Sequence, residues 1–524
     1  MTQEKSGSQS LKKTRLGVVA VVGVMYTMVA SGAYGIEDMI PSSGPGMTIL
    51  MLILLALLWG YPLSLICSEL GSAIPEEGGS YVWAKKAFGE FWGFQVGFWR
   101  VIGSYVGVPT YVVLGGNYIG ALLGWSDTGT LIFKFALILI FAYINWRGVK
   151  EMATLSTILS VIICIAFLAV MVIGFANWNT NPIDPFIPEG QGTIMSMSVA
   201  MAIGIWMYSG YESMAIIAGE LENPQVIPKA LLITFPLVLI TYIPTTLAGL
   251  ASVGDWQNWG TDGISYGDVA ALAAPWMQYA FVVVAFIGQI AMFNSFLGNN
   301  ARVIFILSDD NMAPKVLSKV NKHGVPSVSL ISFVVVSAVL CMLDFSVLAT
   351  LTVTAMMLGY TVIAIAAIYF RAKYPDMKRP YKVGMPNWMF YAMCGLIPVI
   401  SVIALYINGT DYFLFGALLV IAGPFIYWIL KKLYGGTHEH EKGRLTSMNR
   451  GDFRNISFLL IVMGILCIGG YFFLPVYEDP GLYEESYGSG AFNVFVNCIG
   501  GIGAASFIAG LIFAALHKKS EKLY

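Results

Sequence analysis

Long apolar stretches recur along the whole chain, and short segments rich in Gly, Pro or charged residues separate them. The hydrocarbon core of a bilayer is about 30 Å thick, and an α-helix needs about 20 apolar residues to cross it. Windows of that length predict an all-α membrane protein with about fourteen transmembrane helices and no soluble domain between them. The predicted segments are 16–40, 47–73, 91–123, 130–147, 154–176, 193–219, 230–253, 277–307, 327–343, 346–370, 388–407, 412–433, 456–474 and 491–516.

Positive charges gather in every second loop between these segments. Lys and Arg are enriched in the cytoplasmic loops of membrane proteins. This alternation therefore predicts an even number of crossings, with both the N-terminus and the C-terminus in the cytoplasm. The intervening loops contain acidic residues but no Lys or Arg. The basic loops contain Lys85 and Lys86, Arg147 and Lys150, Lys229, then Lys315, Lys319 and Lys322, then 371–382, and finally 431–454.

The composition excludes a soluble protein. Hydrophobic residues make up 57% of the chain and charged residues 11%, with a net charge of -1 and a mean hydropathy of +0.73. The six cysteines form no CxxC pair, and the four histidines lie in predicted loops or tails, so neither a disulfide framework nor a metal site follows. We expect no cofactor, no metal ion, no catalytic residue and no nucleic-acid partner, and a location in the cytoplasmic membrane.

Two apolar segments are interrupted by small and charged residues. The first interruption is Ser31-Gly32-Ala33-Tyr34-Gly35, followed by Glu37 and Asp38, and the second is Ser209-Gly210-Tyr211-Glu212-Ser213. Every backbone N–H and C=O at membrane depth needs a partner, so such a segment must face protein or a water-filled cavity. A simple kink or a close contact between helices is the alternative for either one alone.

The two interruptions have equivalent places if the chain is an inverted repeat of five helices plus five. Broken helices leave backbone N–H groups for an anion at one end and carbonyl groups for a cation at the other, and an amino acid carries both charges. The division predicted on this basis is a tail at 1–15, repeats at 16–176 and 193–370, two helices at 388–433, a cytoplasmic loop at 434–455, two extra helices at 456–516 and a tail at 517–524.

Two motifs make the chain similar to a known family. The stretch WMYSGYESMAIIAGELENPQ at 206–225 and the stretch ELGSAIPEEGGSYVWAKKAFG at 69–89 resemble signatures of the amino acid–polyamine–organocation superfamily of transporters. Arg379-Pro380-Tyr381 is a weaker match. Together the matching positions extend over about 15–433. The resemblance implies a leucine-transporter-type fold that works by alternating access.

The resemblance also implies roles for single residues. Ser31, Gly32 and Ala33 would hold the solute, Trp206 would be an aromatic gate, and Glu212 would couple the sixth helix to binding or to proton movement. Three features depart from the family pattern. Gly35-Ile36-Glu37-Asp38 is more similar to the polyamine–proton symporters, segment 154–176 has no lysine, and two helices follow the usual twelve.

The candidate residues have structural alternatives. Glu212 is an ionisable group deep in an apolar segment, which indicates a cavity or a partner, although it could also cap the broken helix. An ion pair between helices or a side chain that reaches the interface would explain Arg100 and Lys134. The predicted substrate-binding residues are Ser31, Gly32, Ala33, Tyr34, Gly35, Glu37, Trp206, Tyr208, Ser209, Gly210, Tyr211 and Glu212, and the predicted coupling or gating residues are Glu212, Trp206, Glu69 and Glu220.

The predicted function is secondary active transport of amino acids, by proton symport or by exchange. A polyamine symporter or antiporter is the alternative, because Glu37, Asp38 and Glu212 favour cationic solutes. A channel or a membrane-bound enzyme is disfavoured, since no polar stripe along several helices and no catalytic constellation at membrane depth is visible. The expected partners are a small-molecule solute, protons and membrane lipids. The sequence leaves open the solute, the coupling and the oligomeric state.

Overall fold

The computed structural model describes residues 17–30, 32–76, 78–147, 152–213, 223, 226–437 and 448–521. These residues form helices and connecting turns, with two isolated β-bridges in the loops, Trp259 to Ile264 and Val320 to Pro326. The fold is therefore all-helical throughout the described part, as predicted.

Eleven stretches of helix in the described residues are long and apolar enough to cross a membrane. One of them is formed by α3 (Pro45–Leu55), a π-helical turn η1 (Ala56–Gly60) and α4 (Tyr61–Ala73) in succession. The other ten are α6 (Glu90–Leu123), α7 (Asp127–Arg147), α8 (Met152–Ala176), α11 (Val226–Ser252), α13 (Trp276–Asp309), α15 (Phe345–Lys373), α16 (Asn387–Ile407), α17 (Thr410–Tyr434), α18 (Arg450–Tyr477) and α20 (Ala491–Glu521).

Three further apolar helices are shorter, with 12 to 15 residues each: α1 (Val18–Val29), α9 (Thr193–Met207) and α14 (Ser327–Leu340). Short helices in the connections are α2 (Met39–Ser43), α5 (Ser80–Phe88), η3 (Trp256–Asn258), α12 (Tyr266–Ala271), η4 (Lys315–Ser318) and α19 (Pro480–Tyr487). Two of the three shorter apolar helices, α1 and α9, each end just before one of the predicted interruptions.

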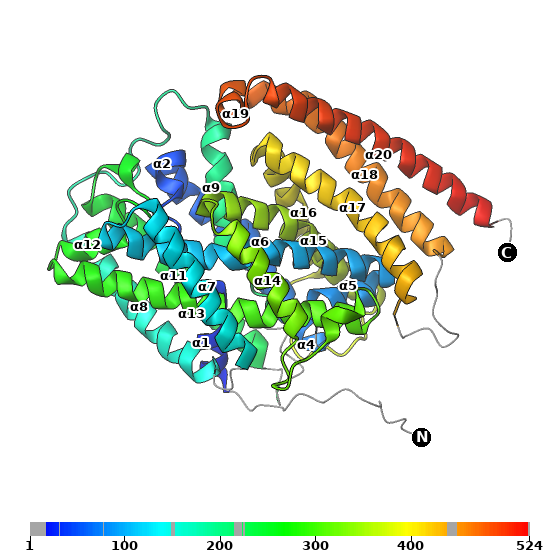
Figure 1. Cartoon of the computed structure of the whole chain (residues 1–524), viewed down its shortest axis with the longest axis horizontal. Helices are drawn as coiled ribbons and strands as arrows, with labels where there is room; N and C mark the ends of the chain where they lie inside the picture. Colours follow the sequence, from blue (N-terminus) through cyan, green and yellow to red (C-terminus); the bar gives the residue numbers. More distant parts are fainter. Residues whose placement is uncertain are drawn as a thin grey trace.

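The long helix α6 runs through the interior and packs against α13 and α15, while α1 packs against α8 and α11 (Figure 1). Helices α18 and α20 lie together along one side of the molecule, next to α17. The apolar pattern located most of the long helices within a few residues. It did not show the π-helical turn, because a single wider turn leaves the run of apolar residues unbroken.

Candidate functional site

The first predicted interruption lies between two helices. Helix α1 ends at Val29, and α2 begins at Met39. Gly32 and Gly35 have φ angles of 103° and 91°, which glycine adopts freely and other residues avoid. A Cβ atom on Gly32 would lie 2.2 Å from the ring of Phe167. The chain can turn here because glycine adopts these positive φ angles freely and has no side chain to overlap the ring of Phe167.

The second interruption follows the end of α9 at Met207. Gly210 has a φ of 102°, and the hydroxyl group of the intervening Ser209 makes two hydrogen bonds. Trp59 Nε1, from the π-helical turn η1, donates to Ser209 Oγ at 3.1 Å, and this hydroxyl donates to Ile205 O at 2.6 Å. The π-helical turn thus supplies the indole that supports the chain where the helix stops.

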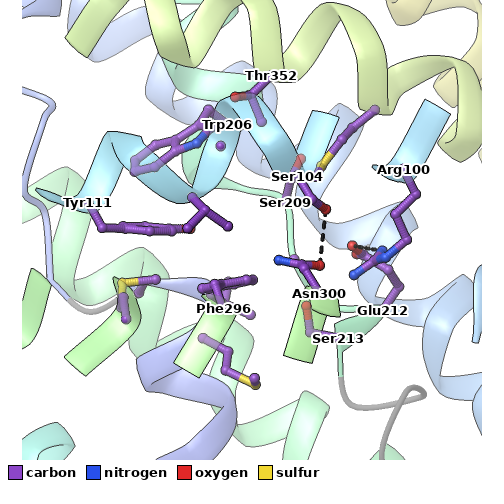
Figure 2. A pocket seen from close by; sticks show the side chains of 18 of the residues that line it. Arg100, Ser104, Tyr111, Trp206, Ser209, Glu212, Ser213, Phe296, Asn300 and Thr352 are labelled. Atoms are coloured by element: carbon purple, nitrogen blue, oxygen red, sulfur yellow. Dashed lines mark hydrogen bonds and ion pairs between the residues drawn. The ribbon is translucent and has the colours of Figure 1, made fainter. Parts of the chain in front are cut away.

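A cavity lies between the end of α1 and the end of α9. Ala30 and Tyr34 line it from the first interruption, Ser209 and Gly210 from the second, and α6, α13 and α15 complete the walls (Figure 2). Its volume is about 50 Å³. One water needs about 10–15 Å³ by the same kind of measure, so the walls must move apart before a solute as large as an amino acid can enter.

An ion pair occupies one end of the cavity. Arg100 Nη1, on α6, donates to Glu212 Oε1 at 2.8 Å, and the Tyr360 hydroxyl, on α15, donates to the same oxygen at 3.0 Å. The side chains of Arg100 and Glu212 are only 8% and 2% exposed. The pair carries no net charge, because each residue compensates the charge of the other at membrane depth.

Five residues that line the cavity each have a buried polar atom without a hydrogen-bond partner among the described residues. These atoms are Arg100 Nε, Glu212 Oε2, Tyr34 Oη, Ser213 Oγ and Gln289 Oε1. Buried polar groups in proteins are nearly always paired, so a cluster of unpaired ones at a cavity needs an explanation. The set contains donors, acceptors and hydroxyl groups that can act as either, which suits a small polar solute.

The opposite side of the cavity is aromatic (Figure 2). The ring of Tyr111 stacks on Phe296 with centroids 5.2 Å apart and lies 5.8 Å from Trp206. Trp206 in turn meets Phe345 edge to face at 5.3 Å. The cavity therefore has a charged and polar end and an apolar end, as expected for a solute with a polar head and an apolar side chain.

A family model described as amino acid permease matches residues 16–430. The chain belongs to the amino acid permease family. The superfamily resemblance found in the sequence motifs is confirmed, and the protein is a multi-pass membrane transporter of a family of permeases. The match ends within α17, so α18, α19 and α20 follow the part of the permease that the family model covers.

Two relatives are named for different classes of solute. A probable polyamine transporter of Arabidopsis thaliana is 25% identical over 389 residues, which are 73% of this permease and 77% of that protein. The branched-chain amino acid permease BcaP of Bacillus subtilis is 26% identical over 418 residues, which are 73% of this permease and 86% of that protein.

The crystal structure of MhsT in complex with L-phenylalanine has the same fold. It superposes with a TM-score of 0.55 and 13% sequence identity, over 75% of this permease and 100% of MhsT. At that identity the likeness concerns the fold alone, and it agrees with the leucine-transporter-type fold predicted from the motifs.

The permease brings part of the predicted substrate-binding set together. Tyr34, Trp206, Ser209, Gly210 and Glu212 line the cavity, whereas Gly32, Ala33, Gly35, Glu37, Tyr208 and Tyr211 do not. The two tyrosines are buried beside other aromatic rings: Tyr208 packs on Tyr242 and Tyr211 on Phe235. Ser31 and Glu220 lie outside the described residues.

The acidic pair after the first interruption is buried and bonded elsewhere. Glu37 accepts hydrogen bonds from the backbone N–H of Gly35 and from the Tyr118 hydroxyl, both at 2.9 Å. Asp38 accepts from the backbone N–H of Thr261 at 2.7 Å. Neither carboxylate lines the cavity. These acids hold the interrupted segment against α6 and against the loop before α12.

Three side chains of the polar end were not predicted as site residues. Arg100 was expected either to form an ion pair between helices or to reach the membrane interface, and the structure shows the ion pair, with Glu212 as its partner. Ser104 Oγ donates to Asn300 Oδ1 at 3.0 Å across α6 and α13. The two adjacent asparagines Asn299 and Asn300, within the apolar segment 277–307, were the sequence signal that could have indicated a polar site residue on α13.

Within the described residues, no group of three or more His, Cys, Asp and Glu side chains could hold a metal ion.

Glu69, predicted to organise a gate, lies at the end of α4 in a buried cluster. Its carboxylate accepts from Arg371 Nε at 2.9 Å and Nη2 at 2.6 Å, and from the backbone N–H of Val383 at 2.9 Å. Arg379 Nε lies 3.4 Å away, and the Arg371 guanidinium lies 3.7 Å from the ring centre of Phe390. The cluster ties α4 to α15, to α16 and to the loop between them.

Replacing Glu69 with glutamine is expected to lower the free energy of unfolding by about 3–5 kcal/mol, because Arg371 would stay buried without its counter-charge. The matched control is Glu76→Gln, since Glu76 forms an ion pair with Lys86 at the surface, where a pair contributes about 0–1 kcal/mol. Thermal unfolding of the two purified variants in one detergent measures the difference. Equal, small shifts would show that the buried cluster contributes little.

Proposed function

We propose that this permease transports neutral amino acids by alternating access, with the solute held between the interrupted ends of α1 and α9. The proposal includes the predicted repeat of 16–176 and 193–370 around that site. Eleven long apolar helices and three shorter ones in the described residues support the predicted fourteen crossings. The alternation of basic and acidic loops supports cytoplasmic termini.

The observation that carries the proposal is the charge balance of the cavity. Among the described residues that line it, Glu212 is the one acidic residue and Arg100 is the one basic residue. A zwitterion adds no net charge to this site. Its ammonium group can donate to the unpaired Glu212 Oε2, while its carboxylate can accept from Arg100 Nε or from N–H groups at the interrupted helices.

The aromatic end of the cavity bears on the solute's side chain. Tyr111, Trp206 and Phe296 offer apolar surface opposite the ion pair, which suits an apolar or aromatic side chain. The small present volume means that Trp206 and its neighbours must shift when a solute of that kind enters. Such a movement of Trp206, at the end of α9, is what the proposed role as an aromatic gate requires.

A polyamine is the second candidate, because similar proteins are named polyamine transporters and because Gly35-Ile36-Glu37-Asp38 is similar to such symporters. A polyamine carries at least two positive charges, and burying them requires carboxylates or other acceptors for each. The described lining of the cavity offers one carboxylate, and that carboxylate already pairs with Arg100. The charge balance therefore favours a neutral amino acid.

Uptake into proteoliposomes tests this function. We expect saturable uptake of labelled leucine or phenylalanine, competed by excess unlabelled neutral amino acids and not by putrescine. An imposed pH gradient distinguishes proton symport from exchange, and unlabelled amino acid inside the vesicles tests exchange directly. Saturable putrescine uptake without uptake of any neutral amino acid would contradict the proposal and favour the polyamine alternative.

A further inference from the structure

Two asparagines follow one another in α13, within a segment that is otherwise mostly apolar. Asn299 and Asn300 are both buried, with exposures of 8% and 3%. Asn300 belongs to the described lining of the substrate cavity, whereas Asn299 does not. Successive residues of an α-helix point about 100° apart, so the two amides face different surroundings. Asn300 therefore offers an amide to the solute, and Asn299 is a neighbour of the same chemistry that does not.

A hydrogen bond to α6 fixes the orientation of the Asn300 amide. Ser104 Oγ donates to Asn300 Oδ1 at 3.0 Å, so the amide oxygen is occupied. Figure 2 shows the amide nitrogen on the other side, turned toward Phe296. This nitrogen has no hydrogen-bond partner among the described residues. Buried amide donors in proteins are nearly always paired, so the free N–H groups of Asn300 are suited to an acceptor on a ligand.

Asn300 lies next to the ion pair that is proposed to hold the ammonium group of the solute. Residues four apart on a helix share one face, with about 5–6 Å between their Cβ atoms, so Ser104 is one turn from Arg100 on α6. Asn300, bonded to Ser104, lies between the Arg100–Glu212 pair and the aromatic end of the cavity (Figure 2). The ammonium and carboxylate groups of an amino acid are attached to the same carbon atom, so their binding groups must lie close together. The position of Asn300 meets this requirement.

We propose that Asn300 Nδ2 donates to the carboxylate of the solute while Glu212 Oε2 accepts from the ammonium group. This inference rests on the proposed function and adds a determinant of specificity to it. Asn300 distinguishes an amino acid from the corresponding amine, which has the same side chain and no carboxylate. Because an amide is uncharged, the contact leaves the charge balance of the cavity unchanged. Because its oxygen already accepts from Ser104, the amide presents a donor to the cavity, which favours an anionic group over an ammonium group.

Binding of leucine to the purified full-length permease tests the contact. In Asn300→Leu, which has a side chain of similar size and no donor, the dissociation constant for leucine is expected to rise by about tenfold or more, since a hydrogen bond to a charged group is lost. Asn299→Leu is the matched control, because it removes a buried amide from the adjacent position, outside the described lining of the cavity. Its dissociation constant should stay near the wild-type value. Thermal unfolding confirms in each case that the variant is folded.

Exchanging the amide for a carboxylate tests the specificity. The probes are leucine and isoamylamine, which is leucine without its carboxylate. In Asn300→Asp the preference for leucine over isoamylamine should fall by about tenfold or more, because the new carboxylate repels the carboxylate of leucine and attracts the ammonium group of both ligands. Asn299→Asp should keep the wild-type preference. A general loss of structure would weaken the binding of both ligands alike, so the ratio separates a specific contact from a structural effect.

Equal effects of Asn300→Leu and Asn299→Leu on leucine binding would overturn the role of Asn300. A folded Asn300→Asp variant with the wild-type preference for leucine would overturn it as well. Both results leave the proposed function intact, provided that the wild-type permease takes up neutral amino acids. Absence of any such uptake by the wild-type permease would contradict the proposed function itself, and the role of Asn300 with it.

Discussion

Exchanging Glu212 for glutamine is expected to reduce uptake of neutral amino acids by about tenfold to a hundredfold, because a charge-assisted hydrogen bond to the solute's ammonium group is worth about 1.5–3 kcal/mol. Exchanging Arg100 for glutamine should shift selectivity instead. The unpaired Glu212 then gives the cavity a net negative charge, and the ratio of lysine or putrescine uptake to leucine uptake should rise by about tenfold or more.

The double variant Arg100→Gln/Glu212→Gln is the control for both. Each single change leaves a buried charge without its partner and should lower the free energy of unfolding by about 3–5 kcal/mol, whereas the double change should recover much of that loss. It should also remove the preference for cationic solutes. If a folded Arg100→Gln variant kept the wild-type ratio of cationic to neutral uptake, the charge balance of the cavity would not determine the solute.

Replacing Gly32 with alanine is expected to produce the second large effect, loss of most transport activity. The backbone at φ 103° is strained for any residue with a side chain, at a cost of about 1–3 kcal/mol, and the added Cβ would overlap the ring of Phe167. The interrupted segment must shift to relieve both, and Ala30 and Tyr34, which line the cavity on either side of it, would shift with it. Uptake assays and thermal unfolding measure the two consequences.

The matched control is Gly192→Ala at the start of α9. Gly192 has a φ of -72°, and a Cβ there meets nothing within 4 Å. Stability should change little and transport should stay near the wild-type rate. Equal activity of the two alanine variants would show that the conformation of the first interruption is not needed for transport.

The features that could be predicted are those that depend only on the residue types within one short stretch of sequence. Small residues inside an apolar run identified both interruptions, and α1 and α9 do end before them. The charge of Glu212 in such a run identified it as a residue that needs a cavity or a partner. The two motifs pointed to the family that the comparison then showed.

Features that depend on packing were beyond the sequence. The partner of Glu212 is Arg100, more than a hundred residues earlier, and only the rotation of α6 in the folded bundle brings the two together. The same holds for Tyr208 and Tyr211, which were among the predicted substrate-binding residues. Both rings pack against other aromatic rings instead, Tyr208 against Tyr242 and Tyr211 against Phe235.

A structure of the permease with a bound neutral amino acid tests the central claim most directly. We expect the ammonium group of the ligand within hydrogen-bond distance of Glu212 Oε2 and its side chain against Tyr111 and Trp206, between the ends of α1 and α9. A ligand bound elsewhere, with the Arg100–Glu212 pair and the aromatic wall unchanged, would contradict the account.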